Sequence, residues 1–151
     1  MAKTTRASRS DRGTDLRKRP SALGHYRKAM PALARAQRVT EQASRLGFDW
    51  PEPEPVWQKV AEELGELEKA LSSGDHNHVR MELGDLFFSL VNLSRFLHIE
   101  AEDALRLATD RFIERFKHIE RSLSERGKNL AESSLEEMDS LWEEAKKREK
   151  F

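Results

Sequence analysis

Five acidic residues in two short motifs carry the strongest chemical signal in the sequence. Glu62, Glu63 and Glu66 form a Glu-Glu-x-x-Glu motif, and Glu82 and Asp85 form a Glu-x-x-Asp motif. Helical residues three positions apart lie on one side, so Glu63 with Glu66, and Glu82 with Asp85, project as pairs. Hard divalent cations prefer carboxylate oxygens, and Mg²⁺ usually keeps room for water and substrate phosphates. These four carboxylates are therefore predicted to bind Mg²⁺, with Mn²⁺ as a substitute.

The spacing of the two motifs is symmetric about Gly74. Glu66 lies eight residues before it and Glu82 eight after, whereas Glu63 and Asp85 lie eleven residues away on either side. A turn at Gly74 folds two helices into an antiparallel hairpin, with both pairs about 12–17 Å from the turn at matched heights. Four carboxylates this close would repel one another without a cation. The hairpin is the predicted metal site, and the alternative is ordinary solvated charges on Glu-rich helices.

The elements that must position these residues are all predicted to be helical. Gly74 suits a helix end, Asp75 suits a helix start, and Ser134 and Glu137 have capping-box spacing. Three alternating prolines after Trp50 predict an extended connector. No strand alternation is present. The fold class is therefore an all-α helical bundle, with helices expected over residues 32–46, 56–72, 75–97, 101–126 and 135–148.

Two helices of the predicted hairpin differ in polarity. The helix over 56–72 has one apolar face, and Glu62 points away from that face on a helical wheel. The helix over 75–97 carries apolar residues on nearly all sides, among them Met81, Phe87 and Phe88. Such a helix is expected to be buried on more than one side. We therefore predict a homodimer, or a higher homo-oligomer, formed through the hairpin helices.

Composition limits the classes of protein to consider. The chain has 151 residues and no cysteine, which excludes disulfides, thiolate zinc sites and cysteine nucleophiles. Residues 1–40 carry 11 Lys and Arg against two acids, and residues 1–28 are predicted to be a disordered basic tail before a domain over 29–151. Nucleic acid is not expected as a partner, because the tail lacks interleaved aromatics. Neither a secretory signal nor a membrane-spanning stretch is found, so a cytoplasmic protein is expected.

The acidic motifs also resemble the EExxE…ExxD signature of the MazG-type nucleoside triphosphate pyrophosphohydrolases. The resemblance runs from about residue 29 to residue 147 and is closest to the C-terminal, catalytic half of tandem MazG proteins. Besides the signature, the similar segments are Pro31–Leu33, Ala36–Gln37, Gly47–Trp50, Val91–Arg95, Arg111–Phe116 and Leu141–Glu143.

This resemblance implies an all-α NTP pyrophosphatase fold and an enzyme that hydrolyses NTP or dNTP to the monophosphate and pyrophosphate. Such an enzyme could clear non-standard nucleotides. The family's metal ligands fall on Glu63, Glu66, Glu82 and Asp85, in agreement with the spacing argument. Its nucleotide contacts fall on Lys59, Arg111, Arg115 and Trp142, with Arg80 in the less similar stretch 78–81.

The residue types at these positions suit a nucleotide, although each has a simpler interpretation. Arg111 and Arg115 lie four apart on one helix, so two guanidinium groups could bind phosphate oxygens or pair with surface acids. Trp142 could stack on a base or pack in the last helix. Asn92 lies two turns after Asp85 and is a ligand contact or a hydrogen-bonded structural amide. Lys59 faces phosphate or solvent.

The predicted mechanism is a metal-assisted attack of water on the α-phosphorus, with pyrophosphate as the leaving group. A carboxylate that is not fully used by the metal could accept the proton, and Glu62 and Glu63 remain alternatives for this general base. Other functions also remain open. One is a narrow-specificity pyrophosphatase of the dUTPase or phosphoribosyl-ATP type, and another is a non-enzymatic helical binding module with a basic tail.

Overall fold

The computed structural model describes residues 21–24 and 29–148. The predicted all-α class is confirmed for these ranges, in which every regular element is helical. The disordered tail expected over residues 1–28 lies outside the described residues, apart from a turn at Ser21–Gly24. The elements are α1 (Ala32–Arg45), α2 (Glu54–Ser73), α3 (His76–Phe96), α4 (Ala101–Glu125), the short 3₁₀ helix η2 (Leu130–Glu132) and α5 (Leu135–Arg148).

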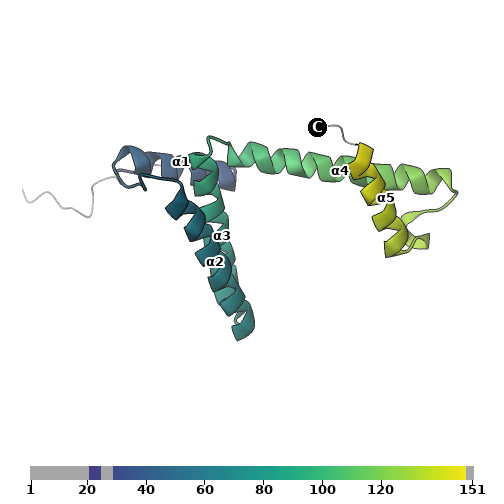
Figure 1. Ribbon diagram of the computed structural model, residues 1–151, viewed down its shortest axis with the longest axis horizontal. Helices are drawn as coiled ribbons and strands as arrows, with labels where there is room; N and C mark the ends of the chain where they lie inside the picture. The colour runs from purple at the N-terminus through teal and green to yellow at the C-terminus, as the bar shows by residue number, and fades with distance from the viewer. Residues whose placement is uncertain (1–20, 25–28, 149–151) are drawn as a thin grey trace, which may run out of the picture.

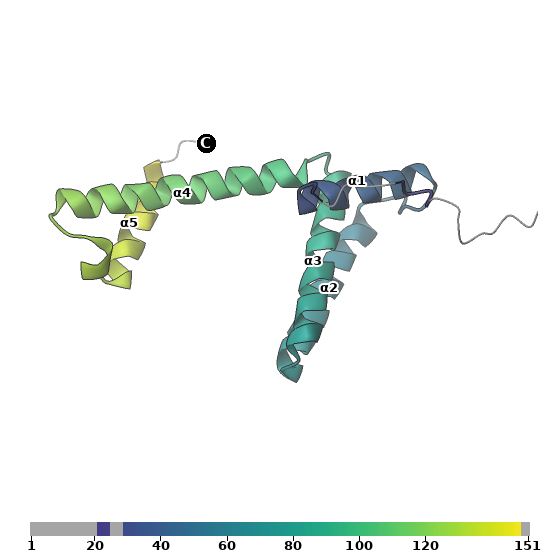
Figure 2. The ribbon, with the colours of Figure 1, turned by 180° about the vertical axis from the view of Figure 1, so that it is seen from behind.

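The helices form two regions. Helices α2 and α3 lie side by side as a hairpin, and α1 lies across the end of this hairpin that is farther from its turn (Figure 1). Helix α4 starts near that same end and runs away from the hairpin as a long rod, with α5 packed against its distal half (Figures 1 and 2). We call α1, α2 and α3 the body and α4 with α5 the arm.

The turn of the hairpin lies at the predicted glycine. Gly74 has a φ of 72°. Glycine adopts this left-handed conformation readily because it has no Cβ to clash. The Asp75 side chain then accepts hydrogen bonds from the backbone N–H groups of Asn77 and His78, at 2.9 and 3.3 Å. These bonds satisfy N–H groups that lack an intrahelical partner. A helix stop followed directly by a helix start therefore folds α3 back along α2.

Helix α2 starts two residues earlier than predicted, at Glu54 rather than Val56. Pro55 therefore lies in the first helical turn and not in an extended connector. Proline is tolerated there because its missing N–H would have no intrahelical acceptor in any case. The N–H groups of Val56 and Trp57 both donate to the Pro53 carbonyl, each at 3.1 Å.

The arm has a small apolar core of its own. Ile119, Leu123 and Leu141 are buried together between α4 and α5. The Ser134 hydroxyl oxygen accepts a hydrogen bond from the Glu137 N–H at 3.2 Å, which gives the serine half of the predicted capping box. The Glu137 carboxylate pairs with Lys128 at 3.0 Å and Arg126 at 3.3 Å.

The expectation that α3 is buried on several sides is wrong for the single chain. Met81 is 64% exposed and Phe87 53% exposed, because α4 runs away from the hairpin and leaves this surface uncovered. Apolar residues of α4, including Leu105 and Phe112, are exposed as well. None of the described helices combines the length and apolar character needed to cross a bilayer.

Candidate functional site

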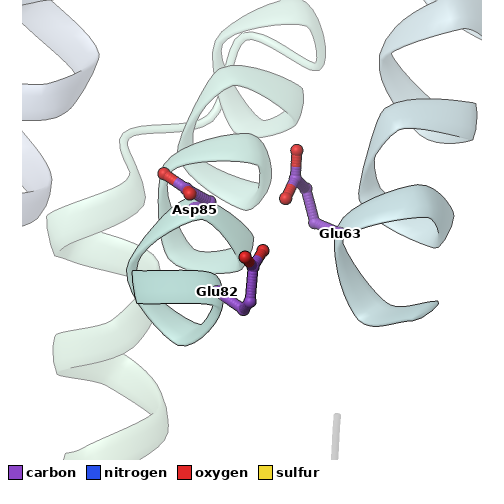
Figure 3. A group of neighbouring side chains, drawn as sticks. All are labelled: Glu63, Glu82 and Asp85. Atoms are coloured by element: carbon purple, nitrogen blue, oxygen red, sulfur yellow. The ribbon is translucent and has the colours of Figure 1, made fainter. Parts of the chain in front are cut away.

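Three acidic side chains from the hairpin converge at one place. Glu63 on α2 and Glu82 and Asp85 on α3 have carboxylate oxygens that all lie within 4.8 Å of one another. Figure 3 shows Glu63 reaching from α2 toward the two residues on α3. Glu63 is buried, Glu82 is half-buried and Asp85 is exposed. We call these three residues the acidic cluster.

The fourth carboxylate of the predicted ligand set points elsewhere. Glu66 lies near the cluster in sequence, but its carboxylate pairs with the Lys69 ammonium on the same helix at 2.7 Å. This partner lowers the pKa of Glu66. The structure thus brings three of the four predicted metal ligands together and leaves Glu66 in a local ion pair.

Basic side chains flank the cluster. The Lys59 ammonium lies 2.6 Å from a Glu63 oxygen and 3.0 Å from a Glu62 oxygen, and His78 Nε2 lies 3.0 Å from a Glu82 oxygen. Hydrogen bonds to Glu63 and Glu62 raise the pKa of Lys59 to about 12, so this ammonium is charged at neutral pH. The Glu62 side chain lies toward solvent, as the helical wheel predicted, and meets the site only through Lys59.

A cavity of about 500 Å³ adjoins the acidic cluster. This volume is in the range of sites for small ligands. Lys59, Glu63, Asp85 and Asn92 line part of its wall, so two of the six predicted substrate contacts, Lys59 and Asn92, lie beside two members of the cluster. The remaining wall is mainly apolar and comes from α1, the segment after it and α3, including Val39, Ala43, Leu46, Phe48, Trp50 and Phe88.

The other predicted substrate contacts do not meet the cluster within one chain. Arg111, Arg115 and Trp142 belong to the arm, which runs away from the hairpin (Figures 1 and 2). The Arg115 guanidinium lies over the Trp142 ring, 5.3 Å from its centroid, and the Phe112 ring centroid is 5.0 Å from that of Trp142. Trp142 thus packs within the arm. Arg80 donates to the Asn77 side chain near the hairpin turn, at 3.2 Å.

Sequence reasoning assigned no role to Asp49, Trp50 or Arg95, which also line the cavity. In the sequence, Gly47–Trp50 and Val91–Arg95 stand out only as segments that resemble a family. A pairing of Asp49 with Arg95 had no signal in the sequence, because these residues are 46 positions apart and in different elements.

The chemistry of the cluster fits a hard divalent cation. All three side chains offer oxygen, the ligand type such ions prefer, and none offers sulfur. Carboxylates that converge this closely repel one another, and a bound cation would remove that repulsion. The adjoining cavity leaves space for a ligand of the cation.

Comparison with known proteins assigns the segment that contains both acidic motifs to a known domain. Residues 52–120 match the MazG nucleotide pyrophosphohydrolase domain. The chain is 46% identical over 130 residues to the nucleoside triphosphate pyrophosphohydrolase/pyrophosphatase MazG of Thermotoga maritima, covering 86% of this chain and 50% of that protein. It is 38% identical over 131 residues to the nucleoside triphosphate pyrophosphohydrolase of Escherichia coli K12, covering 85% and 50% of the two chains.

A third relative is the uncharacterized protein YabN of Bacillus subtilis, 43% identical over 131 residues, or 86% of this chain and 27% of YabN. The chain therefore spans half, or less, of the length of these curated relatives. The matched segment contains both acidic motifs, the hairpin that joins them and most of α4. Residues 52–120 of this all-helical chain therefore belong to the MazG nucleotide pyrophosphohydrolase domain family.

Proposed function

We propose that this chain hydrolyses nucleoside triphosphates, NTP or dNTP, to the monophosphate and pyrophosphate, with Mg²⁺ as its cofactor. The observation that carries the proposal is the convergence of Glu63, Glu82 and Asp85 beside a ligand-sized cavity. The Thermotoga and Escherichia relatives, both named nucleoside triphosphate pyrophosphohydrolases, support the same reaction class.

The acidic cluster is the proposed metal site. Glu63, Glu82 and Asp85 would hold the cation, and Glu66 would join them after a rotation of its side chain away from Lys69. When bound, Mg²⁺ shields the charge of the phosphate chain and makes a water molecule more acidic. Mn²⁺ is proposed to substitute because it takes the same oxygen ligands.

The remaining residues of the site bind the phosphates and handle the proton. Lys59, charged and on the cavity wall, is placed to bind a phosphate oxygen. Water attacks the α-phosphorus, the bond from that phosphorus to the bridging oxygen breaks, and a carboxylate takes the proton. Glu62 and Glu63 are both candidates for this general base: Glu63 belongs to the proposed ligand set, and Glu62 pairs with Lys59 beside it.

We further propose that a second copy of the chain completes each site. Arg111 lies ten residues into α4 and Asp85 eleven residues before the end of α3. At the rise of an α-helix these separations are about 15 Å and about 17 Å from the junction of the two helices. Because the two helices diverge, the arm of one chain cannot reach its own cluster (Figures 1 and 2). The arm of a partner could supply Arg111 and Arg115 and would cover exposed apolar surface of α3.

The direct test is phosphorus NMR of the products formed from ATP and Mg²⁺. We expect AMP and pyrophosphate from the wild-type chain, and a rate about 100- to 1000-fold lower from Asp85→Ala, the order of effect seen when a main electrostatic contribution is removed. Asp103→Asn is the matched control, since Asp103 pairs with Arg106 on the exposed surface near the start of α4, away from the cluster. Helical content measured by circular dichroism should be unchanged in both variants.

Two results would contradict this proposal: orthophosphate as the first product, or full activity in Asp85→Ala. The same assay run with dUTP, phosphoribosyl-ATP and chemically altered triphosphates separates a broad hydrolase from one with a narrow substrate range. If the chain is instead a helical binding module, it should turn over none of these compounds and should bind nucleic acid in a salt-dependent manner.

A further inference from the structure

The segment between α1 and α2 forms part of the cavity wall although little of it is covered. Phe48 and Trp50 both line the cavity, yet Phe48 is 82% exposed. A segment with so few packing contacts opens easily unless specific interactions hold it. Its position therefore depends on the few hydrogen bonds that tie it to neighbouring helices.

The N–H groups of Gly47 and Phe48 donate to the Ser44 and Ala43 carbonyls of α1, at 2.9 and 3.0 Å, and one arginine supplies the tie to α3. Arg95 donates two parallel hydrogen bonds to the Asp49 carboxylate, at 2.6 and 2.8 Å, and a third from Nε to the Asn92 amide oxygen at 3.0 Å. The side chains of Arg95 and Asp49 are only 14% and 21% exposed. This two-pronged geometry is specific to arginine, because a lysine ammonium is a single point of charge. Arg95 also lowers the pKa of Asp49.

Asp49 also holds the backbone of Trp50, one of the two aromatic residues of this segment that line the cavity. The carboxylate oxygen that accepts from Arg95 at 2.6 Å also accepts from the backbone N–H of Trp50 at 2.9 Å. Arg95, Asp49 and the Trp50 backbone thus form one connected network. On its other side, the network holds Asn92, which lies two turns along α3 from Asp85.

The network lies at the distance from the acidic cluster where a nucleoside would be. Asp85 and Arg95 are ten residues apart on α3. This separation is about 15 Å along the axis of a helix. If the phosphate chain binds at the cluster, the sugar and base of a triphosphate would extend into this part of the cavity.

The hydroxyl groups of Thr40 and Ser89, which line this cavity, already donate hydrogen bonds to backbone carbonyls. Thr40 donates to the Gln37 carbonyl at 2.8 Å, and Ser89 donates to the Leu86 carbonyl at 2.9 Å. The wall near the network therefore offers a nucleoside mainly aromatic and apolar faces, among them Phe48 and Trp50.

We propose that Arg95 is a positioning residue that, through Asp49, holds Trp50, next to Phe48, as part of the wall against which the nucleoside of the substrate stacks. This inference rests on the proposed nucleotide hydrolysis. Stacking on an aromatic face is open to every base. Arg95 also lines the cavity, and the role proposed for it is exerted through Asp49, Asn92 and the wall.

The test uses Arg95→Lys and Asp49→Asn in the full chain, with Asp103→Asn as control. Asp103 pairs with Arg106 on the exposed surface of α4, so the control breaks an ion pair outside the cavity. In Arg95→Lys and Asp49→Asn, the two wall variants, we expect KM for ATP to rise about tenfold or more. The kcat of both should stay within about threefold of the wild-type value. An interaction that positions the nucleoside without stabilising the transition state has this signature.

Hydrogen exchange provides a readout that does not depend on turnover. The Trp50 amide should exchange at least about tenfold faster in both wall variants, with amides of α2 and α3 unchanged. In the wild-type chain, added ATP should slow exchange of this amide. Slowing on raising the protein concentration, with no effect of ATP, would mean that a second copy covers the wall, which would overturn its assignment to the nucleoside.

The possible failures can be told apart. Unchanged exchange at Trp50 and unchanged KM in both variants would overturn the positioning role, as would a fall in kcat with KM unchanged. A wild-type chain that releases no pyrophosphate from any triphosphate would overturn the proposed function, while the exchange measurement would still decide whether Arg95 holds the wall.

Discussion

The body and the arm differ in what they bury. Among the described residues, five polar or charged side chains are buried, namely Gln37, Thr40, Glu63, Ser89 and Asn92, and all belong to the body. The residues buried in the arm are all apolar, such as Ile119, Leu123 and Leu141. Burying a polar group costs free energy unless a partner compensates for it, so its location indicates where a fold accommodates function.

The buried polar residues of the body have two different tasks. Thr40, Glu63, Ser89 and Asn92 all line the cavity. Gln37 instead joins the two regions: its amide oxygen accepts from the Ala101 N–H at 2.8 Å and its amide nitrogen donates to the Ile99 carbonyl at 3.3 Å. The body therefore contains the cavity, and the arm is a rod with an apolar core whose start is fixed by α1. In the proposed dimer, charged groups of the arm act on a site in a different chain.

Mixing two inactive variants tests this division most strongly. Glu82→Gln disables the body and Arg111→Ala disables the arm, so each homodimer is expected to be nearly inactive. In a mixed dimer, one composite site combines an intact body with an intact arm, and statistical mixing should restore about a quarter of wild-type activity. The measurement is pyrophosphate release after subunit exchange.

If each chain builds its site alone, a mixed dimer contains no intact site. An absence of restored activity would therefore contradict the shared site. The control mixes Glu82→Gln with Asp85→Ala, both in the body, and should stay inactive. Light scattering on the same samples gives the oligomeric state, and a monomer would remove the basis for a shared site.

Local sequence signals account for much of the body. Gly74 and Asp75 encode a helix stop and a helix start in consecutive residues, so the turn was predictable and the spacing then placed Glu63 near Glu82 and Asp85. The start of α2 was less predictable, because Pro55 is compatible both with an extended connector and with a first helical turn.

Contacts between distant residues could not be predicted. Glu66 pairs with Lys69 rather than with the cluster, and spacing along a helix does not determine which of two nearby partners a side chain takes. Asp49 meets Arg95 only because the segment after α1 folds back over α3. The direction of α4 is likewise a tertiary property, so sequence reasoning grouped Arg111, Arg115 and Trp142 with the cluster although the fold of one chain separates them.

The stability of the arm should be separable from metal binding in the body. Leu123 is 1% exposed. Leu123→Ala should therefore lower the free energy of unfolding by about 2–5 kcal/mol. We expect Mn²⁺ affinity, measured calorimetrically with the metal alone, to stay within about twofold, since the cluster shares no contact with this core. Val56→Ala in α2, where Val56 is also 1% exposed, is the matched control in the body. A loss of Mn²⁺ affinity well beyond twofold in Leu123→Ala, as large as that in Val56→Ala, would show that the regions are coupled.

The smallest expected effect concerns the charge beside the cluster. Lys59 lies 2.6 Å from Glu63 and competes with any cation for that carboxylate. Lys59→Met should therefore tighten Mn²⁺ binding about two- to fivefold, in keeping with the modest strength of a partly exposed ion pair. The pKa of Lys59 is raised from 10.5 to about 12, so its charge persists throughout the neutral range. The gain in affinity should accordingly not vary between about pH 6 and about pH 9.

A second lysine shows whether Glu66 belongs to the metal site. Lys69→Met frees the Glu66 carboxylate in the same way and should tighten Mn²⁺ binding only if Glu66 is a ligand. Calorimetric titration of both lysine variants with Mn²⁺ alone makes the comparison. Weaker binding by Lys59→Met would mean that Lys59 orders Glu63 for the metal instead of competing with it, because the loss of a pure competitor can only strengthen binding.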